Sequence, residues 1–224
     1  MAPTPLIATP QLLELLQGLH AQSTTQESSL KWGTLPAQCS DEFDTLMRDK
    51  FIALDQDKCE LVYHLLRSIN AKTVVEAGTS FGVSTIYLAL AVAQNLARDG
   101  DGQGRVIATE KEPSKASQAQ ANWARAGSEI EGVIDLRVGD LRDTLTRDLG
   151  VVDFVLLDIW TPLALPALKL VQPHLRRGAI IMTDNTLKAG AGYEDLFAYI
   201  DAEGSGFRRI TLPYEGGLDM IVYQ

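Results

Sequence analysis

The sequence of 224 residues has few of the residues that carry some common chemistries. Its two cysteines, Cys39 and Cys59, are not spaced as C-x-x-C, so neither a redox dithiol nor a cysteine-based zinc site is expected. Three histidines, His20, His64 and His174, lie in segments of helical periodicity, far from the glycine-rich turn described below. This argues against a histidine-centred zinc site or a catalytic triad.

Positive charge is also scarce. There are 20 Lys and Arg against 29 Asp and Glu, which gives a net charge of −9 and a pI near 4.8. Binding to nucleic acids and to anionic membranes depends largely on Lys and Arg, so we expect neither as a partner. No apolar run reaches the roughly 18 residues of a membrane span, and residues 1–30 contain no arginine. We therefore expect a cytoplasmic protein without a targeting segment.

With 46% hydrophobic residues, the chain fits one α/β domain over residues 1–224, made of an N-terminal helical segment (1–70) and a Rossmann-like core (71–224). From residue 73 onward, segments typical of strands and helices alternate, as in a parallel sheet with helices on both faces. Two final apolar runs, 207–214 and 218–223, are joined through two glycines and predict a hairpin. We expect a seven-stranded, mostly parallel sheet whose other strands are 73–76, 105–110, 134–138, 152–157 and 179–184.

The N-terminal segment predicts three helices. Leucines at helical spacing in residues 10–20 indicate a first helix, and the polar string 22–29 after it indicates a loop. This helix either docks on the core or acts as a lid or dimer contact. Residues 40–69 predict two more helices, the first capped by Ser40 and the second with the apolar stripe Leu61, Leu65, Leu66 and Ile69.

The most informative stretch is residues 73–84, Thr-Val-Val-Glu-Ala-Gly-Thr-Ser-Phe-Gly-Val-Ser. It predicts a strand, a tight turn and a helix whose N-terminal N–H groups face a ligand. A dinucleotide-binding turn would have three glycines as G-x-G-x-x-G. This turn has Gly78 and Gly82 only, and it is opened by Glu76, which would repel a pyrophosphate. It resembles motif I of the class I S-adenosylmethionine (SAM) methyltransferases, where the acidic residue and the glycine loop face the cationic end of SAM. The alternative is a glycine-rich turn without a ligand.

Acidic residues follow the predicted strands at the edge where ligands of open α/β sheets bind. Glu110 takes the position expected of a carboxylate that binds ribose, although it could instead cap the helix that begins near Pro113. Asp140 is a weaker candidate for the adenine edge. Trp160 could pack on the adenine face or be a core aromatic residue.

Asp158, Asp184 and Asn185 stand at two strand ends and offer two carboxylates and one amide oxygen. Such hard oxygen donors suit Mg²⁺, Mn²⁺ or Ca²⁺ rather than zinc. From about Asp55 to its C-terminus, the chain resembles the cation-dependent catechol and caffeoyl-CoA O-methyltransferases. The match lies at Glu76, Gly78, Gly82, Ser84, Glu110, Asp158, Asp184 and Asn185, and in the closing Gly-Gly-Leu-Asp-Met-Ile-Val.

The resemblance implies SAM as methyl donor, a divalent cation on Asp158, Asp184 and Asn185, and often a homodimer. The implied cofactor-binding residues are Glu76, Gly78, Ser80, Gly82, Ser84, Glu110, Asp140, Asp158 and Trp160. The implied reaction is methyl transfer to a hydroxyl of a small aromatic vicinal diol, such as a catechol or flavonoid.

One departure bears on the mechanism. The family usually has a lysine, taken as the general base, three residues after the first metal aspartate, and this chain has Thr161 there. Either the cation alone acidifies the acceptor hydroxyl, which makes Asp158 catalytic, or another group such as Lys188 takes the proton. The rival interpretations are a nicotinamide-dependent oxidoreductase, which the missing glycine and the hairpin disfavour, and a SAM-binding protein without catalysis.

Overall fold

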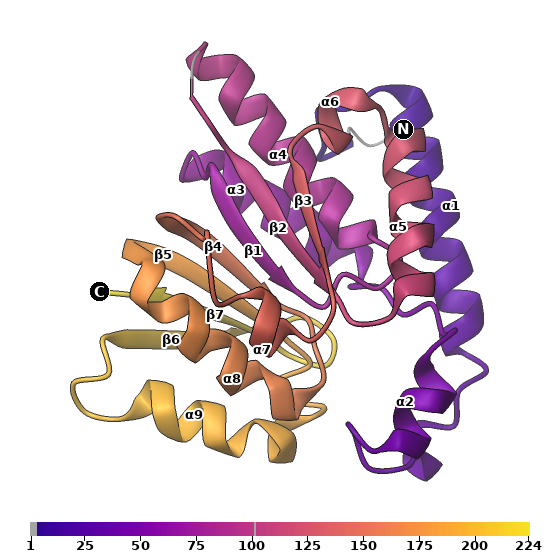
Figure 1. Cartoon of the computed structure of the whole chain (residues 1–224), viewed down its shortest axis with the longest axis vertical. Coiled ribbons are helices and arrows are strands. Elements are labelled where there is room, and N and C mark those ends of the chain that lie inside the picture. Colours follow the sequence, from indigo (N-terminus) through magenta and orange to yellow (C-terminus); the bar gives the residue numbers. More distant parts are fainter. Residues whose placement is uncertain (1–3, 101) are drawn as a thin grey trace.

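Seven strands form one sheet in a computed structural model, which describes residues 4–100 and 102–224 (Figure 1). The strand order is β3-β2-β1-β4-β5-β7-β6, and β7 runs antiparallel to the other six strands. The predicted fold is confirmed. The strands are β1 (Thr73–Ala77), β2 (Arg105–Glu110), β3 (Ile134–Val138), β4 (Val152–Leu157), β5 (Leu175–Asp184), β6 (Phe207–Leu212) and β7 (Leu218–Tyr223).

Helices cover both faces of the sheet (Figure 1). One face packs against α1 (Pro10–Glu27), α3 (Gln56–Ser68), α4 (Val83–Asp99) and α5 (Pro113–Ala126). The other packs against α7 (Leu141–Thr144), α8 (Thr161–Val171) and α9 (Glu194–Asp201). The remaining elements are α2 (Asp41–Met47), α6 (Ser128–Glu131) and the 3₁₀ turns η1 (Trp32–Thr34), η2 (Gln172–His174) and η3 (Gly190–Tyr193). Among the described residues, no helix has the length and apolar character that a membrane span requires.

The core divides into two layers because successive residues of a strand face opposite sides of the sheet. In β1, Val74 belongs to the cluster under α3 and α4, whereas Val75 belongs to the cluster under α8 and α9. Both side chains are fully buried, and burying a valine contributes about 1.5–3 kcal/mol. The sheet is thus packed on both faces, and the side chains at its carboxyl edge lie over this core.

The first helix is longer than predicted. α1 continues to Glu27 through most of the polar string assigned to a loop. The polar side chains bond within the helix or to the chain beside it: Thr24 Oγ1 donates to the carbonyl of His20, and Ser23 Oγ donates to the Glu27 carboxylate. Such local hydrogen bonds satisfy the hydroxyl groups without ending a helix. The polarity of this string was therefore not enough to predict the end of α1.

Two strand boundaries and the buried face of α3 also differ from the prediction. β5 begins at Leu175 rather than 179, and β6 ends at Leu212 rather than 214. In α3 the buried apolar face is centred on Val62 and Leu66, while Leu61 and Leu65 are only partly buried. The cap of α2 is as predicted, because Ser40 Oγ accepts a hydrogen bond from the N–H of Phe43.

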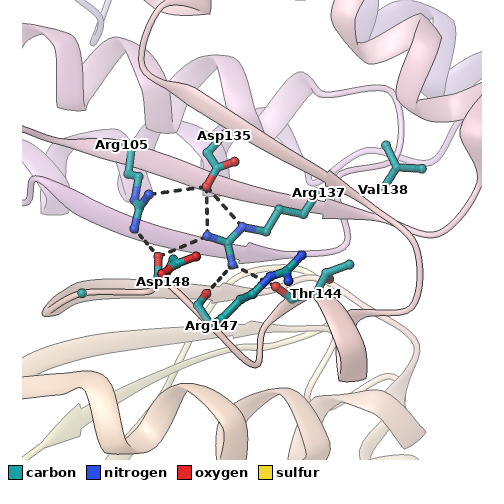
Figure 2. A pocket seen from close by; sticks show the side chains of 8 residues that line it. Arg105, Asp135, Arg137, Val138, Thr144, Arg147 and Asp148 are labelled. Atoms are coloured by element: carbon teal, nitrogen blue, oxygen red, sulfur yellow. Dashed lines mark hydrogen bonds and ion pairs between the residues drawn. The ribbon is translucent and has the colours of Figure 1, made fainter.

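A hollow of about 750 Å³ at the β3 edge is organised by Arg137 (Figure 2). Its guanidinium donates to the carboxylate of Asp135 and to the carbonyls of Thr144, Arg147 and Asp148, at 2.8 to 3.2 Å. These contacts hold the connection between α7 and β4 against β3, the edge strand. Because its donors are engaged by the chain itself, we assign Arg137 a structural role.

Candidate active site

The turn between β1 and α4 requires glycine at two positions. Gly78 has φ 97°, and a Cβ there would lie 2.0 Å from the carbonyl oxygen of Asp158. Gly82 has φ 78°, and a Cβ there would lie 2.3 Å from Nε1 of Trp123, which donates a hydrogen bond to the Gly82 carbonyl at 3.0 Å. The turn is therefore pressed against β4 on one side and against α5 on the other, in a conformation that only glycine adopts without strain.

Glu76 lies behind this turn rather than in a cavity. Its fully buried carboxylate accepts hydrogen bonds from the hydroxyls of Thr79, Ser84 and Thr85 at 2.5 to 2.8 Å. Burial raises the pKa of Glu76, although the three hydroxyl hydrogen bonds oppose this rise. Glu76 and Ser84 thus fix the shape of the turn together, and neither they nor Gly82 line the cavities described next.

Two cavities meet at the carboxyl edge of the sheet. The first cavity, of about 350 Å³, is lined by residues that include Gly78, Glu110, Asp140 and Trp160. The second cavity, of about 590 Å³, is lined by Asp158 and Asp184, the two carboxylates predicted to bind a metal, and by Lys188 and Ser80. Gly78, Lys115, Ile159 and Trp160 line both. The structure therefore brings together Gly78, Ser80, Glu110, Asp140, Asp158, Trp160, Asp184, Asn185 and Lys188.

Glu110 connects the first cavity to the glycine turn. Its Oε2 accepts a hydrogen bond from the N–H of Ser80 at 2.7 Å, and its Oε1 accepts one from the N–H of Glu112 at 2.8 Å. Burial raises the pKa of Glu110, while the backbone N–H groups lower it. Glu110 thus lines the first cavity, and the N-cap residue of α5 is Glu112 rather than Glu110. Binding of ribose by Glu110 stays a prediction.

Asp140 and Trp160 also line the first cavity. Asp140 caps α7 by accepting from the N–H of Arg142, whose guanidinium also bonds it and lowers its pKa. The ring of Trp160 meets Phe43 of α2 edge to face, with 4.7 Å between centroids. Because Phe43 is buried, α2 is anchored over the carboxyl edge of the sheet, beyond the strand tips (Figure 1).

The second cavity contains Asp158, directly after β4, and Asp184, the last residue of β5. Asp184 Oδ1 lies 2.7 Å from Nζ of Lys58, and its Oδ2 accepts a hydrogen bond from Nδ2 of Asn185 at 2.6 Å. Lys58 also pairs with Asp55 at 2.8 Å. Lys58 was not predicted as a site residue. In the sequence it is only a lysine beside the apolar face of α3.

The two aspartates disfavour each other's charge. Burial raises the pKa of Asp158 well above its usual value, and the charges of Asp184 and Glu76 raise it further. Burial also raises the pKa of Asp184, although the hydrogen bond from Lys58 opposes it. Crowded carboxylates of this kind suit an added cation. In residues 4–100 and 102–224 no three His, Cys, Asp or Glu side chains form a metal-binding group, so a third ligand would be the amide of Asn185.

The residue in place of the usual lysine is tied to the N-terminal segment. The N–H and the hydroxyl of Thr161 both donate to Oε1 of Gln38 at 3.0 Å. Nearby, Nζ of Lys188 lies 5.6 Å from the ring centroid of Trp32. Gln38 and Trp32 line the second cavity, and neither carried a sequence signal, because the segment that supplies them has no motif.

The donor set also fits SAM. Ser80 lines the second cavity, and its Oγ is buried without a hydrogen-bond partner in the described chain, which leaves a hydroxyl beside the cavity for a ligand group. The first cavity offers the Glu110 carboxylate for hydroxyl groups, and the acidic second cavity suits a cationic group.

Comparison with known proteins decides the family. Residues 75–186 match the protein family described as Methyltransferase domain. The chain is 32% identical over 177 residues to a catechol O-methyltransferase of Mycobacterium tuberculosis, an alignment that covers 77% of this chain and 74% of that protein. The chain belongs to the class I SAM-dependent O-methyltransferases.

A second relative agrees with this assignment, and a solved structure shares the fold. A catechol O-methyltransferase of Niastella koreensis is 29% identical over 147 residues, covering 62% of this chain and 60% of that protein. The O-methyltransferase TomG of Streptomyces achromogenes, solved in complex with SAM, superposes with a TM-score of 0.72 at 21% identity over 98% of this chain and 92% of that chain. As a member of this family, the chain is a SAM-dependent O-methyltransferase, and the nicotinamide and non-catalytic alternatives are set aside.

Proposed function

We propose that this O-methyltransferase transfers the methyl group of SAM to one hydroxyl of a small aromatic vicinal diol, with a divalent cation held by Asp158, Asp184 and Asn185. The observation that carries the proposal is the meeting of two carboxylates of raised pKa in one cavity, which joins the first cavity at Gly78 and Trp160. Catechol O-methyltransferase is also the name of two relatives.

A divalent cation at this site would compensate for the absence of the lysine that the family usually has. A phenol has a pKa near ~10, and a divalent cation at these side chains would supply the positive charge that favours the ionised form. Mg²⁺, Mn²⁺ and Ca²⁺ all suit two carboxylates and an amide oxygen. Lys188 lies in the same cavity and is the chain's own candidate to receive the proton.

The first cavity would hold the nucleoside half of SAM. Glu110 would accept hydrogen bonds from the ribose hydroxyls, Asp140 would contact the adenine edge, and Trp160 would cover its face. Gly78 would let the methionyl part pass close to the main chain, between the two cavities. Catalysis would then consist mainly of holding the two reactants in line and stabilising charge.

Further features stay predictions of the sequence. We propose that residues 1–224 form one methyltransferase domain and that the protein acts as a homodimer in the cytoplasm, without a nucleic-acid or membrane partner. The acidic net charge of −9 supports the last point.

The test compares turnover of catechol and of guaiacol, a matched compound with one free hydroxyl, before and after treatment with EDTA. We expect EDTA to remove nearly all turnover of catechol, Mg²⁺ to restore it, and guaiacol to be a poor substrate throughout. SAM binding measured by calorimetry should be largely retained without metal. Asp184→Ala should behave like EDTA treatment, and Asp195→Asn, at an exposed position of α9, is the matched control. Full turnover of catechol in metal-free protein would refute the proposal.

A further inference from the structure

Lys115 is a buried cation without a partner. It lies in the first turn of α5, its residue surface is 8% exposed, and it lines both cavities. Its ammonium takes part in none of the hydrogen bonds or ion pairs found among residues 4–100 and 102–224; Glu110 and Glu112 act on it only through their charges. Burial lowers the pKa of Lys115, and these two charges oppose the effect. Lysines are almost never this buried unless they are paired.

The other basic side chains around the two cavities are already engaged. Arg48 pairs with Glu112 at 3.1 Å, Lys111 pairs with Asp44, and Arg142 pairs with Asp140. Lys188 lies over the ring of Trp32, which is 39% exposed and so marks the outer side of the second cavity. In the described part of the chain, Lys115 is therefore the inner cation left for an anionic group of a ligand.

SAM has one such group. Its sulfonium and amino groups are cationic, and its only anionic group is the carboxylate of the methionyl part. The carboxylates that line the cavities, Glu110, Asp158 and Asp184 among them, suit the cationic groups and repel the carboxylate. A cation at the junction of the cavities removes this conflict.

We propose that the ammonium of Lys115 binds the α-carboxylate of SAM. The methionyl part must run from the Glu110 side to the Asp158 side, and Lys115 lines both cavities together with Gly78 on that path. Ser80 Oγ, buried and without a partner in the wall of the second cavity, is a second donor for the same carboxylate. The inference depends on the use of SAM, and it depends neither on the metal nor on the acceptor.

The experiment compares two ligands that differ in the methionyl part. S-adenosylhomocysteine (SAH) has the carboxylate, and methylthioadenosine lacks it. Isothermal titration should show Lys115→Met binding SAH about tenfold to a hundredfold more weakly than the unchanged protein, because a charge-assisted hydrogen bond is lost. The affinities of the two proteins for methylthioadenosine should differ by no more than about threefold, because this ligand has no carboxylate for Lys115 to bind. Lys115→Arg should recover part of the SAH affinity.

Lys50→Met is the matched control, because it removes the same charge from a neighbour of Lys115 that lines neither cavity. It should leave both affinities nearly unchanged. An equal loss for SAH and methylthioadenosine in Lys115→Met, or unchanged SAH affinity in that variant, would overturn the inference. If Lys115→Met does not fold, the same question is tested with the unchanged protein. Equal affinities of that protein for SAH and for decarboxylated SAH would also overturn the inference. All titrations are done in EDTA, so failure of the metal proposal would leave the result unaffected.

Discussion

The ammonium of Lys58 lies 2.7 Å from Oδ1 of Asp184, so α3 delivers a positive charge directly to the carboxyl edge of the sheet. Lys58 is 1% exposed and makes its second contact with Asp55 at 2.8 Å. Burial alone lowers the pKa of Lys58, but the hydrogen bonds with Asp184 and Asp55 raise it above its usual value. The chain thus supplies part of the charge that Asp158 and Asp184 need.

Replacing Lys58 should cost much more stability than replacing a surface lysine. Lys58→Met leaves Asp184 buried beside Asp158 without its partner, and breaking a buried pair costs about 3–5 kcal/mol. Lys72→Met, which removes the partly exposed pair with Asp99, should cost much less, because such pairs contribute little in water. Urea unfolding of both variants measures the difference, and equal losses would contradict a stabilising role for the Lys58 pair.

The stability contributed by the Lys58 pair should also depend on pH. Because the pKa of Lys58 is raised in the folded protein, this contribution is fully present below the usual lysine range and is lost as the pH rises through the folded pKa. We therefore expect the stability difference between the unchanged protein and Lys58→Met to be constant from pH 7 to 9 and to shrink only at higher pH. A difference that disappears below pH 9 would show that the pair is not the cause.

Asp158 should reduce the stability of metal-free protein at neutral pH. Its raised pKa means that the unfolded chain ionises this carboxyl at lower pH than the folded chain, so folding loses stability as the pH rises above about 4. In EDTA, Asp158→Asn should therefore raise the Tm at pH 8, by about 2–4 °C per kcal/mol, and the gain should be smaller at pH 5. Calorimetric melting across this range checks the sign, and a larger gain at pH 5 would contradict it.

Glu110→Gln should weaken SAM binding. Losing a carboxylate acceptor for hydroxyl groups costs about 1–3 kcal/mol, or roughly tenfold to a hundredfold in affinity. Because Glu110 also accepts from the N–H groups of Ser80 and Glu112, circular dichroism should first establish that the variant is folded. Glu129→Gln, on the exposed surface of α6, is the control. SAM affinity equal to that of the control would remove Glu110 from the ribose site.

Thr161 should act by holding the N-terminal segment and not by moving a proton. Its hydroxyl and N–H bind Gln38, and a Cβ at Gly192 would lie 2.1 Å from its Oγ1, so the side chain is packed between two segments. Thr161→Ala should cost about 1 kcal/mol of stability for one hydrogen bond and should leave the pH dependence of kcat unchanged. Gln38→Ala should give the same result. A loss of kcat of about 10²-fold or more with intact substrate binding would show that Thr161 takes part in proton transfer.

The sheet and its edge could be predicted from the sequence because the signals are local. Strands such as β1 and β4 are short runs of buried residues, and a parallel topology brings the residues that follow them, Asp158 among them, to one edge. The polar string after residue 21 misled the prediction of α1, because its hydroxyls bond within the helix.

The contacts from outside the sheet could not be predicted. Lys58 and Asp184 are 126 residues apart, and Gln38 and Thr161 are 123 residues apart. Nothing in the periodicity of α3 or in the segment before α2 shows which strand end each would meet. Lys115 resembles any solvated lysine of an amphipathic helix until the structure shows that it is buried.

Binding of Mn²⁺, followed by electron paramagnetic resonance during titration of EDTA-stripped protein, tests the central claim most directly. The account predicts one tightly bound Mn²⁺ per chain, loss of that ion in Asp184→Asn and in Asp158→Asn, and unchanged binding in Asp195→Asn. SAH affinity should be similar in the unchanged protein, in Asp184→Asn and in Asp195→Asn. If the two site variants bind Mn²⁺ as tightly as the unchanged protein, or if the unchanged protein binds none, Asp158 and Asp184 do not form a cation site.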